Sequence, residues 1–225
     1  MKTIIKFTVF ITLILGSHLT MQAQNYLTTK VGFKASQPAA AADDELASAI
    51  GAFTLGVRYE RGLNKRISIL TGVDLNARGF SIQLNEAAAN DELDIYYEQR
   101  IRYVDIPLAA KLQLGNDAIG LQFTAGGTFG FATSASNNTI TTLQLDGETE
   151  REVTSDPLDL EEEGYSRFNS AVLLGAGIYG KIGRTQLFLD LTMDAGVSEL
   201  IANEEGTNFV GAEISVGMRL PLGKQ

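Results

Sequence analysis

The sequence predicts an all-β protein: an eight-stranded antiparallel up-and-down transmembrane β-barrel with short periplasmic turns and long acidic extracellular loops. Three observations lead to this prediction. About eight segments of strand length alternate apolar and polar residues, short connections alternate with long acidic ones, and the first 23 residues have the composition of an export signal. Strands that run up and down through a bilayer need short turns on one side and tolerate long loops on the other.

Residues 1–23 are predicted to be a signal peptide that is removed on export. Two lysines precede an apolar run from Phe7 to Leu15, and small and polar residues then lead to Ala23. The apolar run is shorter than the about 20 residues that a membrane-spanning helix needs. Cleavage after Ala23 leaves residues 24–225, which have the length of one domain, the predicted outer-membrane β-barrel domain.

The composition of residues 24–225 excludes several classes of function. The chain has no cysteine and no tryptophan, and its one histidine, His18, lies in the predicted signal. Nucleophile pairs that use histidine or cysteine are therefore excluded, as are metal sites with histidine ligands. Two of the 18 basic residues and none of the 27 acidic ones lie in the signal, so 16 against 27 remain and the net charge is −11. Nucleic acid is excluded as a partner, because its phosphates need a basic surface.

Eight segments are predicted to form the strands, in chain order. Clean alternation supports the first two and the last two, and β-forming residues fill the others. In the second segment, Phe53, Leu55 and Val57 share one face, whereas Arg58 and Glu60 share the other. The predicted strands are Tyr26–Lys34, Ala52–Arg61, Arg66–Ile82, Ile95–Leu114, Ile119–Ser134, Arg167–Ile182, Thr185–Val197 and Phe209–Leu222.

The connections between these strands are of two kinds. Residues 62–65, 115–118 and 183–184 contain Gly or Asn and are predicted to be tight hairpin turns. The long connections hold 19 of the 27 acidic residues and are predicted to be loops at 35–51, 83–94, 135–166 and 198–208. Short and long connections alternate, as in a bacterial outer-membrane barrel.

Alternation alone does not say whether the apolar face meets lipid or an enclosed ligand. A secreted lipocalin-like barrel has the same pattern with its apolar face inward. The lipid-facing arrangement is favoured because the polar face carries glycines and charges of both signs, which can pair in a narrow lumen. The apolar stripes also last about nine to eleven residues, the length of a tilted membrane strand.

The charges on the polar face are predicted to pair inside the barrel. The interior of an eight-stranded barrel is about wide enough for side chains to fill, and an unpaired buried charge is costly. We therefore expect Arg58, Lys111 and Arg219 to form a network that plugs the lumen, rather than an ion path. Their candidate partners are Glu60, Asp74, Asp105, Asp190 and Glu213.

Two motifs resemble ligand sites, one for a dinucleotide and one for calcium, but we interpret neither as a bound cofactor. Residues 175–180 match G-x-G-x-x-G, but they continue as a strand, whereas a dinucleotide site needs the motif to open a helix. Glycines that relieve crowding in the lumen explain the motif better. Residues 156–163 are acidic but lack the spacing of a calcium loop, so we interpret them as a solvated charge run. Weak divalent-cation binding within residues 135–166 is a further expectation, since acidic loops lie beside polyanionic lipopolysaccharide.

Residues 103–111 (YVDIPLAAK) resemble the Tyr-x-acid-Ile-Pro-Leu-x-x-Lys strand of the PorT-like outer-membrane β-barrel domain family of Bacteroidota. Residues 56–63 (GVRYERGL) and 216–222 (VGMRLPL) fit the same family. The resemblance covers essentially all of residues 24–225. It implies an eight-stranded barrel in the outer membrane and no catalytic residues to carry over. The chain departs from the family pattern at its end, where many such barrels have an aromatic residue and this one has Leu222-Gly223-Lys224-Gln225.

The combined expectation is a non-enzymatic protein of the cell outer membrane with a structural or surface-interaction role through its acidic loops. No catalytic, cofactor-binding or metal-binding residue is predicted. The expected partners are outer-membrane lipid, lipopolysaccharide and a protein that contacts the extracellular loops. Two alternatives stay open: an accessory component of protein secretion or transport across the outer membrane, and a secreted lipocalin-like ligand-binding barrel. The resemblance does not choose among them, because fold and function separate readily.

Overall fold

The computed structural model describes residues 24–39, 47–88, 91–116, 118–145, 148–199 and 208–222. The predicted signal peptide, residues 1–23, lies outside the described residues. In the described part of the chain, no helix is long and apolar enough to cross a bilayer. The described residues form nine strands: β1 (Asn25–Pro38), β2 (Ala47–Gly62), β3 (Ile67–Ala88), β4 (Asp91–Gly115), β5 (Ile119–Leu145), β6 (Glu148–Leu158), β7 (Phe168–Ile182), β8 (Thr185–Gly196) and β9 (Phe209–Leu222).

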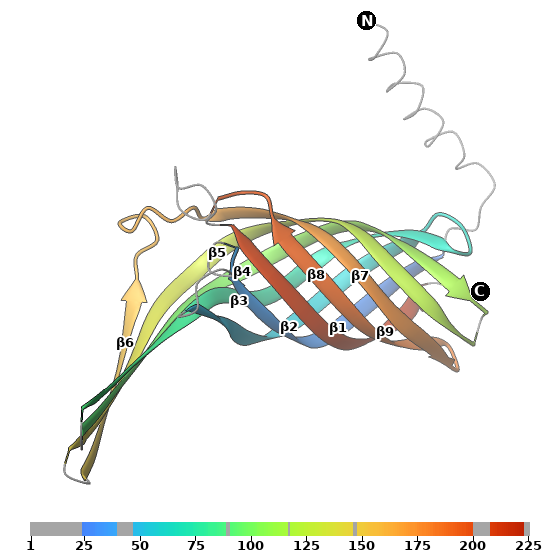
Figure 1. The fold of residues 1–225 in the computed structure, drawn as a ribbon. Coiled ribbons are helices and arrows are strands. Elements are labelled where there is room, and N and C mark those ends of the chain that lie inside the picture. The colour runs from blue at the N-terminus through green and yellow to red at the C-terminus, as the bar shows by residue number, and fades with distance from the viewer. Residues whose placement is uncertain are drawn as a thin grey trace, which may run out of the picture.

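Eight of these strands close into a ring (Figure 1). The ring runs β1–β2–β3–β4–β5–β7–β8–β9 and returns to β1, and every pair is antiparallel. The predicted eight-stranded up-and-down barrel is therefore confirmed. Asn25 of β1 lies opposite Leu222 of β9, so both ends of the described chain lie at the same end of the barrel.

The three tight turns lie where they are predicted, and two of them depend on an asparagine side chain. Asn64 Oδ1 accepts hydrogen bonds of 2.8 Å from the backbone N–H groups of Arg66 and Ile67. Asn116 forms the same pair of bonds in the next turn. An asparagine amide can replace a backbone carbonyl in this way. The third turn contains Gly183 with a φ of 62°, a conformation that favours glycine.

The barrel is apolar outside and polar inside. On β2, Phe53, Leu55 and Val57 are 80%, 56% and 54% exposed, whereas Arg58 and Glu60 are 7% and 0% exposed. The same alternation follows β1, β8 and β9. This is the arrangement of a barrel whose outer surface meets lipid. The lipid-facing assignment of the strand faces is confirmed, and the lipocalin-like alternative, which needs the apolar face inside, is contradicted.

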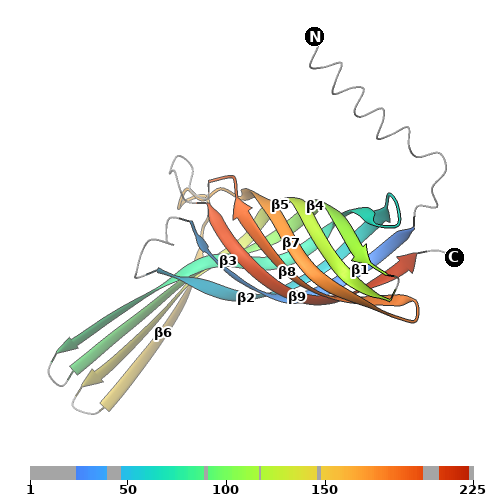
Figure 2. The same cartoon turned by 45° about the vertical axis from the view of Figure 1, so that its right-hand side comes forward.

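Three ring strands run far beyond the barrel at the end opposite the chain ends. β3, β4 and β5 have 22, 25 and 27 residues, compared with 12 to 16 in the other ring strands. Their extensions pair in the order β3–β4–β5 and continue to β6. Figures 1 and 2 show the four strands leaving the rim as one sheet. We call it the projecting sheet: residues 80–88, 91–99, 137–145 and 148–158. At about 3.3 Å per residue, the 11 residues of β6 extend about 35 Å.

The projecting sheet corrects two predicted loops. The sequence predicts loops at 83–94 and 135–166, but the structure continues β3 to Ala88, begins β4 at Asp91, continues β5 to Leu145 and adds β6. The predicted ends of the third and fifth strands, Ile82 and Ser134, and the predicted start of the fourth, Ile95, are therefore wrong. The predicted loop 35–51 is also too long, because β1 continues to Pro38 and β2 begins at Ala47. Its remaining part, and most of the predicted loop 198–208, lie outside the described residues.

The physical reason for this difference is that acidic residues do not exclude a strand. In the projecting sheet they alternate with β-branched residues: Val153 lies between Glu152 and Thr154, opposite Ile140. Such residues favour a pleated surface, and charges that point into water do not prevent backbone pairing. Charges and a proline, Pro157, are also usual on an edge strand, which is the position of β6.

We predict that Leu189→Arg destabilises the barrel by about 2–4 kcal/mol, because Leu189 lies near the middle of β8 on the lipid-facing surface. The control Leu189→Phe should change stability much less. Urea unfolding in lipid vesicles, followed by heat-modifiable gel migration, measures both variants. Equal tolerance of arginine and phenylalanine contradicts the face assignment.

Candidate functional site

The lumen is filled by an ion-pair network. Among the described residues, six buried cations form pairs with five carboxylates on six of the eight ring strands. The cations are Lys30, Lys34, Arg58, Arg78, Lys111 and Arg219, and the carboxylates are Glu60, Asp74, Asp105, Asp194 and Glu213.

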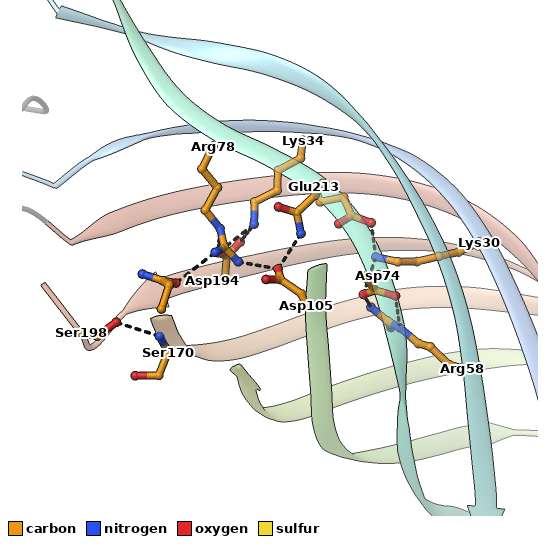
Figure 3. Close-up of polar contacts among 12 residues, drawn as sticks. Lys30, Lys34, Arg58, Asp74, Arg78, Asp105, Ser170, Asp194, Ser198 and Glu213 are labelled. Carbon is orange, nitrogen blue, oxygen red and sulfur yellow. Dashed lines mark hydrogen bonds and ion pairs between the residues drawn. The ribbon is translucent and has the colours of Figure 1, made fainter. Parts of the chain in front are cut away.

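The first layer of the network lies toward the projecting sheet, which begins two residues after Arg78. Figure 3 shows Arg78 beside Lys34, Asp105 and Asp194. Arg78 of β3 pairs with Asp105 of β4 and donates a 3.0 Å hydrogen bond to Asn169 Oδ1 of β7. Its Nε lies 4.0 Å from Asp194 of β8, which also pairs with Lys34 of β1 at 2.7 Å. Because β3 and β8 are four strands apart in an eight-stranded ring, this layer crosses the full width of the barrel.

The middle layer is organised by Asp74 of β3. Its carboxylate accepts a 3.1 Å hydrogen bond from Arg58 Nε of β2 and lies 3.5 Å from Lys30 Nζ of β1. Lys30 also pairs with Glu213 of β9, so the ion pairs form a chain of alternating charge that joins residues of four strands (Figure 3). Each charge has a partner of opposite sign, which offsets the cost of removing it from water.

The third layer lies toward the short turns, and Glu60 of β2 holds two cations there. Lys111 Nζ of β4 donates to its Oε1 at 2.6 Å. Arg219 Nε of β9 lies 2.8 Å from its Oε2, an ion pair whose angle is too bent for a hydrogen bond. Arg219 also donates to Gln113 Oε1 at 2.7 Å, across the ring from β9 to β4, and its guanidinium lies 3.6 Å from the Tyr26 ring centroid.

The predicted lumen pairs are confirmed for all three named cations. Arg58 pairs with Asp74, and both Lys111 and Arg219 pair with Glu60. Of the other predicted acceptors, Asp105 and Glu213 pair with cations that the sequence reasoning did not name. Asp190 forms no ion pair among the described residues and accepts a 2.6 Å hydrogen bond from Gln122 instead.

Three cations of the network were missed: Lys30, Lys34 and Arg78. A usable signal was present for each. Lys30 and Lys34 lie on the polar face of the first strand, and Arg78 follows Asp74 by four residues. Side chains separated by an even number of residues share a face of a strand, so Arg78 enters the lumen with Asp74.

The end of the lumen toward the projecting sheet is closed by an apolar cluster. The cluster contains Ile101 and Tyr103 of β4, Phe209 of β9, and Leu160 from the segment after β6. All four side chains are between 0% and 5% exposed. Tyr165, in the segment after β6, packs against it and exchanges hydrogen bonds with Gln99 at 2.9 and 3.1 Å. β4 and β9 face each other across the ring, so the cluster spans the barrel mouth.

The end of the lumen toward the short turns contains a cavity of about 910 Å³. It is lined by the turns β2–β3 and β7–β8 and by the adjoining ends of the strands. Arg219, Gln113 and Gln186 line it on the lumen side, where Arg219 also donates to Gln186 Oε1 at 3.1 Å. We call this space the turn-side vestibule.

The G-x-G-x-x-G motif lies in a strand, and two of its glycines make room in the lumen. Residues 175–180 belong to β7. A Cβ atom on Gly177 would collide with the Asp190 carboxylate, and one on Gly175 would crowd the Thr192 methyl group. The interpretation that these glycines relieve crowding is therefore confirmed, and no helix N-terminus is present at this motif.

The acidic segment 156–163 is divided between two structures. Asp156 lies in β6, whereas Asp159 begins a turn in which its Oδ1 accepts hydrogen bonds from the Glu161 and Glu162 backbone N–H groups. No group of three metal-ligating side chains converges in the described residues. Weak divalent-cation binding within residues 135–166 stays a prediction.

One face of the projecting sheet carries apolar side chains beside acidic ones. Ile82 pairs with Tyr97 and Leu84 with Ile95, and Leu84 is 45% exposed. Partial burial raises the pKa of the Tyr97 hydroxyl. On the same face of the sheet, β6 presents Glu150 and Glu152.

Both edges of the projecting sheet are open in the described part of the chain. β6 pairs only with β5, and β3 beyond Ile82 pairs only with β4. Open edges present backbone N–H and C=O groups that can pair with a further strand. The projecting sheet therefore offers an apolar face, two pairing edges and a strongly acidic margin.

Comparison with known proteins gives a family match and similar folds. A family model described as "Outer membrane protein beta-barrel domain" matches residues 19–202. No curated protein matches the sequence.

Three solved structures illustrate the similarity of fold. Neisserial surface protein A is 10% identical, with a TM-score of 0.45 over 88% of this chain and 97% of its own. Ail, the attachment invasion locus protein of Yersinia pestis, is 12% identical, with a TM-score of 0.44 over 89% and 100%. The outer membrane protein OprG from Pseudomonas aeruginosa is 12% identical, with a TM-score of 0.40 over 90% and 98%.

We predict that Asp194→Leu destabilises the barrel by about 3–5 kcal/mol, because it leaves Lys34 buried without its carboxylate. The double variant Lys34→Met/Asp194→Leu should recover most of this loss, since Arg78 keeps Asp105 as its partner. Urea unfolding in lipid vesicles measures the wild type, the single variants Lys34→Met and Asp194→Leu, and the double variant. If the double variant loses as much unfolding free energy as the two single variants lose together, the two residues are not a coupled pair.

We also predict that the purified barrel conducts no steady ion current in a planar bilayer. The three charged layers and the apolar cluster fill the lumen between the turn-side vestibule and the projecting sheet. Large, steady conductance of the intact protein contradicts a filled lumen. An open eight-stranded barrel is not expected, because its interior is about as wide as the side chains that line it.

Proposed function

The chain belongs to the outer membrane protein beta-barrel domain family, and from this membership we propose that it is a non-enzymatic surface-interaction protein. In this proposal, short turns face the periplasm, and the projecting sheet extends from the outer side of the membrane to contact a protein partner. The observation that carries the proposal is the projecting sheet itself (Figure 2).

The projecting sheet adds nothing to ring closure. The other five ring strands close the barrel with 12 to 16 residues each, more than the about 9–11 that a tilted strand needs to cross a bilayer. The extensions of β3, β4 and β5 are therefore surplus to membrane insertion. A long ordered extension that presents open edges is suited to binding a partner at a distance from the membrane surface.

The chemistry of the sheet favours a protein partner with basic residues over a second copy of this chain. β6 contains four acidic residues and one basic residue, Arg151, among its 11 residues. Two copies of β6 placed edge to edge would bring like charges together, which is unfavourable. A partner strand with lysine or arginine on alternate positions would pair with the same edge.

The non-enzymatic part of the proposal rests on composition. Beyond the predicted signal peptide the chain has neither histidine nor cysteine, so the usual nucleophile and base pairs have no residues to form them. Five carboxylates of the lumen form ion pairs, and Asp190 accepts a hydrogen bond from Gln122. These facts support binding rather than catalysis.

Several finer assignments belong to the same proposal. The strand at residues 103–111 supports membership of the PorT-like group of Bacteroidota, and residues 1–23 support export by a removed signal peptide. Lipopolysaccharide is the proposed lipid neighbour of the outer rim. An accessory role in protein secretion or transport stays the alternative, and it differs in its partner, which would bind on the periplasmic side.

We predict that removing the projecting sheet leaves the barrel intact and abolishes partner contact. The variant replaces residues 83–96 with one Asn-Gly turn and residues 139–154 with another. The two residues that each turn joins already lie opposite each other on paired strands. Heat-modifiable migration tests the fold, and cross-linking on intact cells followed by purification tests the contact.

A matched control keeps the sheet and neutralises only its acidic edge, by Glu150→Gln, Glu152→Gln and Asp156→Asn. Weakened contact in this control supports recognition of a basic partner. Undiminished contact after removal of the whole sheet overturns the proposed function, and a cross-linked partner on the periplasmic side favours the secretion alternative.

A further inference from the structure

The turn-side vestibule is basic, although the chain as a whole is acidic. Five cationic residues line it: Lys65 and Arg66 from the β2–β3 turn, Lys181 from the end of β7, Arg184 from the β7–β8 turn, and Arg219 from β9. None of its described lining residues is Asp or Glu. The whole chain has a formal net charge of −9, so the sign of this cavity does not follow from the average composition.

The vestibule can be entered from the turn side alone. Behind it, Arg219 joins Gln113 across the ring, and the lumen beyond is filled by the ion-pair layers and closed by the apolar cluster. A ligand would therefore reach the vestibule from the periplasm or from the inner leaflet of the membrane, and it would stop at Arg219.

Three cations of the vestibule have no carboxylate partner among the described residues. Lys65, Arg66 and Lys181 are exposed and form no ion pair within 4.0 Å there. Arg219 shares the single carboxylate of Glu60 with Lys111. The lumen side of the vestibule therefore has two buried cations and one anion. The vestibule therefore has an excess of positive charge from rim to floor.

Amide side chains add neutral hydrogen-bond donors to this positive field. Gln24, Asn116 and Gln186 line the vestibule together with the cations. Guanidinium and ammonium groups combined with amides are the donors that proteins use for oxyanions with several oxygens, phosphate above all. A cavity of about 910 Å³ is also larger than a bare phosphate needs and lies in the range of small-ligand sites.

We propose that the turn-side vestibule binds a phosphate-bearing anion. Two sources share this chemistry: the phosphodiester headgroup of an anionic phospholipid in the inner leaflet, and a soluble phosphate ester of the periplasm. The site lies at the opposite end of the barrel from the projecting sheet, so it is independent of the surface-interaction role.

The test uses the full-length protein in neutral detergent and two probes. Isothermal titration with inorganic pyrophosphate measures binding of a free anion. Native mass spectrometry after exposure to equal amounts of phosphatidylglycerol and phosphatidylcholine measures retention of an anionic headgroup. Heat-modifiable migration confirms that each variant is folded.

Two triple variants with the same change in charge are compared. Lys65→Gln/Arg66→Gln/Lys181→Gln removes three vestibule cations, whereas Arg102→Gln/Arg151→Gln/Arg167→Gln removes three exposed cations elsewhere. We expect the vestibule variant to lose about tenfold in pyrophosphate affinity, the combined effect of three exposed charge contacts. The control should bind pyrophosphate like the wild type. Added salt should weaken pyrophosphate binding to the wild type and to the control.

The outcomes separate the sources and can overturn the proposal. Selective retention of phosphatidylglycerol that is lost in the vestibule variant supports a lipid headgroup. Pyrophosphate binding without selective lipid retention supports a soluble anion. If the wild type binds neither probe, or if both triple variants lose binding equally, the vestibule is not an anion site.

Discussion

The structure depends on one constraint: every charge on the polar face of a narrow barrel must find a partner inside it. An eight-stranded ring leaves room for side chains and little else. Asp74 and Glu60 each hold two cations from other strands, and Arg78 links carboxylates from two further strands of the ring. These pairs satisfy the charges and occupy the space that a channel would need. Glycines such as Gly177 supply the remaining room by omitting a side chain where a carboxylate lies.

Because the centre of the barrel is filled, chemistry that involves other molecules is confined to its two ends. The ends have opposite character. The projecting sheet is acidic, has an apolar patch around Leu84 and has open edges, whereas the turn-side vestibule is lined by cations without a described carboxylate. The apolar cluster around Leu160 and the layer around Arg219 separate the two. A small barrel of this kind can therefore present different surfaces to the two sides of a membrane without joining them.

The sequence predicted the barrel well because its pattern and its physics coincide. Period-two alternation placed Phe53 and Leu55 on one face and Arg58 on the other, and the structure agrees. Tight turns could be located because asparagine and glycine act locally, as at Asn64 and Gly183. The projecting sheet is not predicted, because its acidic segments also have the composition of loops. Acidic residues are compatible with a strand whose faces are solvated, and local composition does not distinguish the two cases.

By itself, the sequence determined the strand number of the ring, its antiparallel order, the division of the four cleanly alternating strands into an apolar and a polar face, and the need for charge pairing in the lumen. These follow from periodicity and turn chemistry, which act over a few residues. Only the tertiary structure decided that Arg78 reaches Asp105 and Asn169, that the β3–β4 and β5–β6 hairpins join into one projecting sheet, and that basic turns converge on one vestibule. The reason is that these arrangements depend on which strands become neighbours after the ring closes, and residues far apart in the chain acquire that proximity only in the closed barrel.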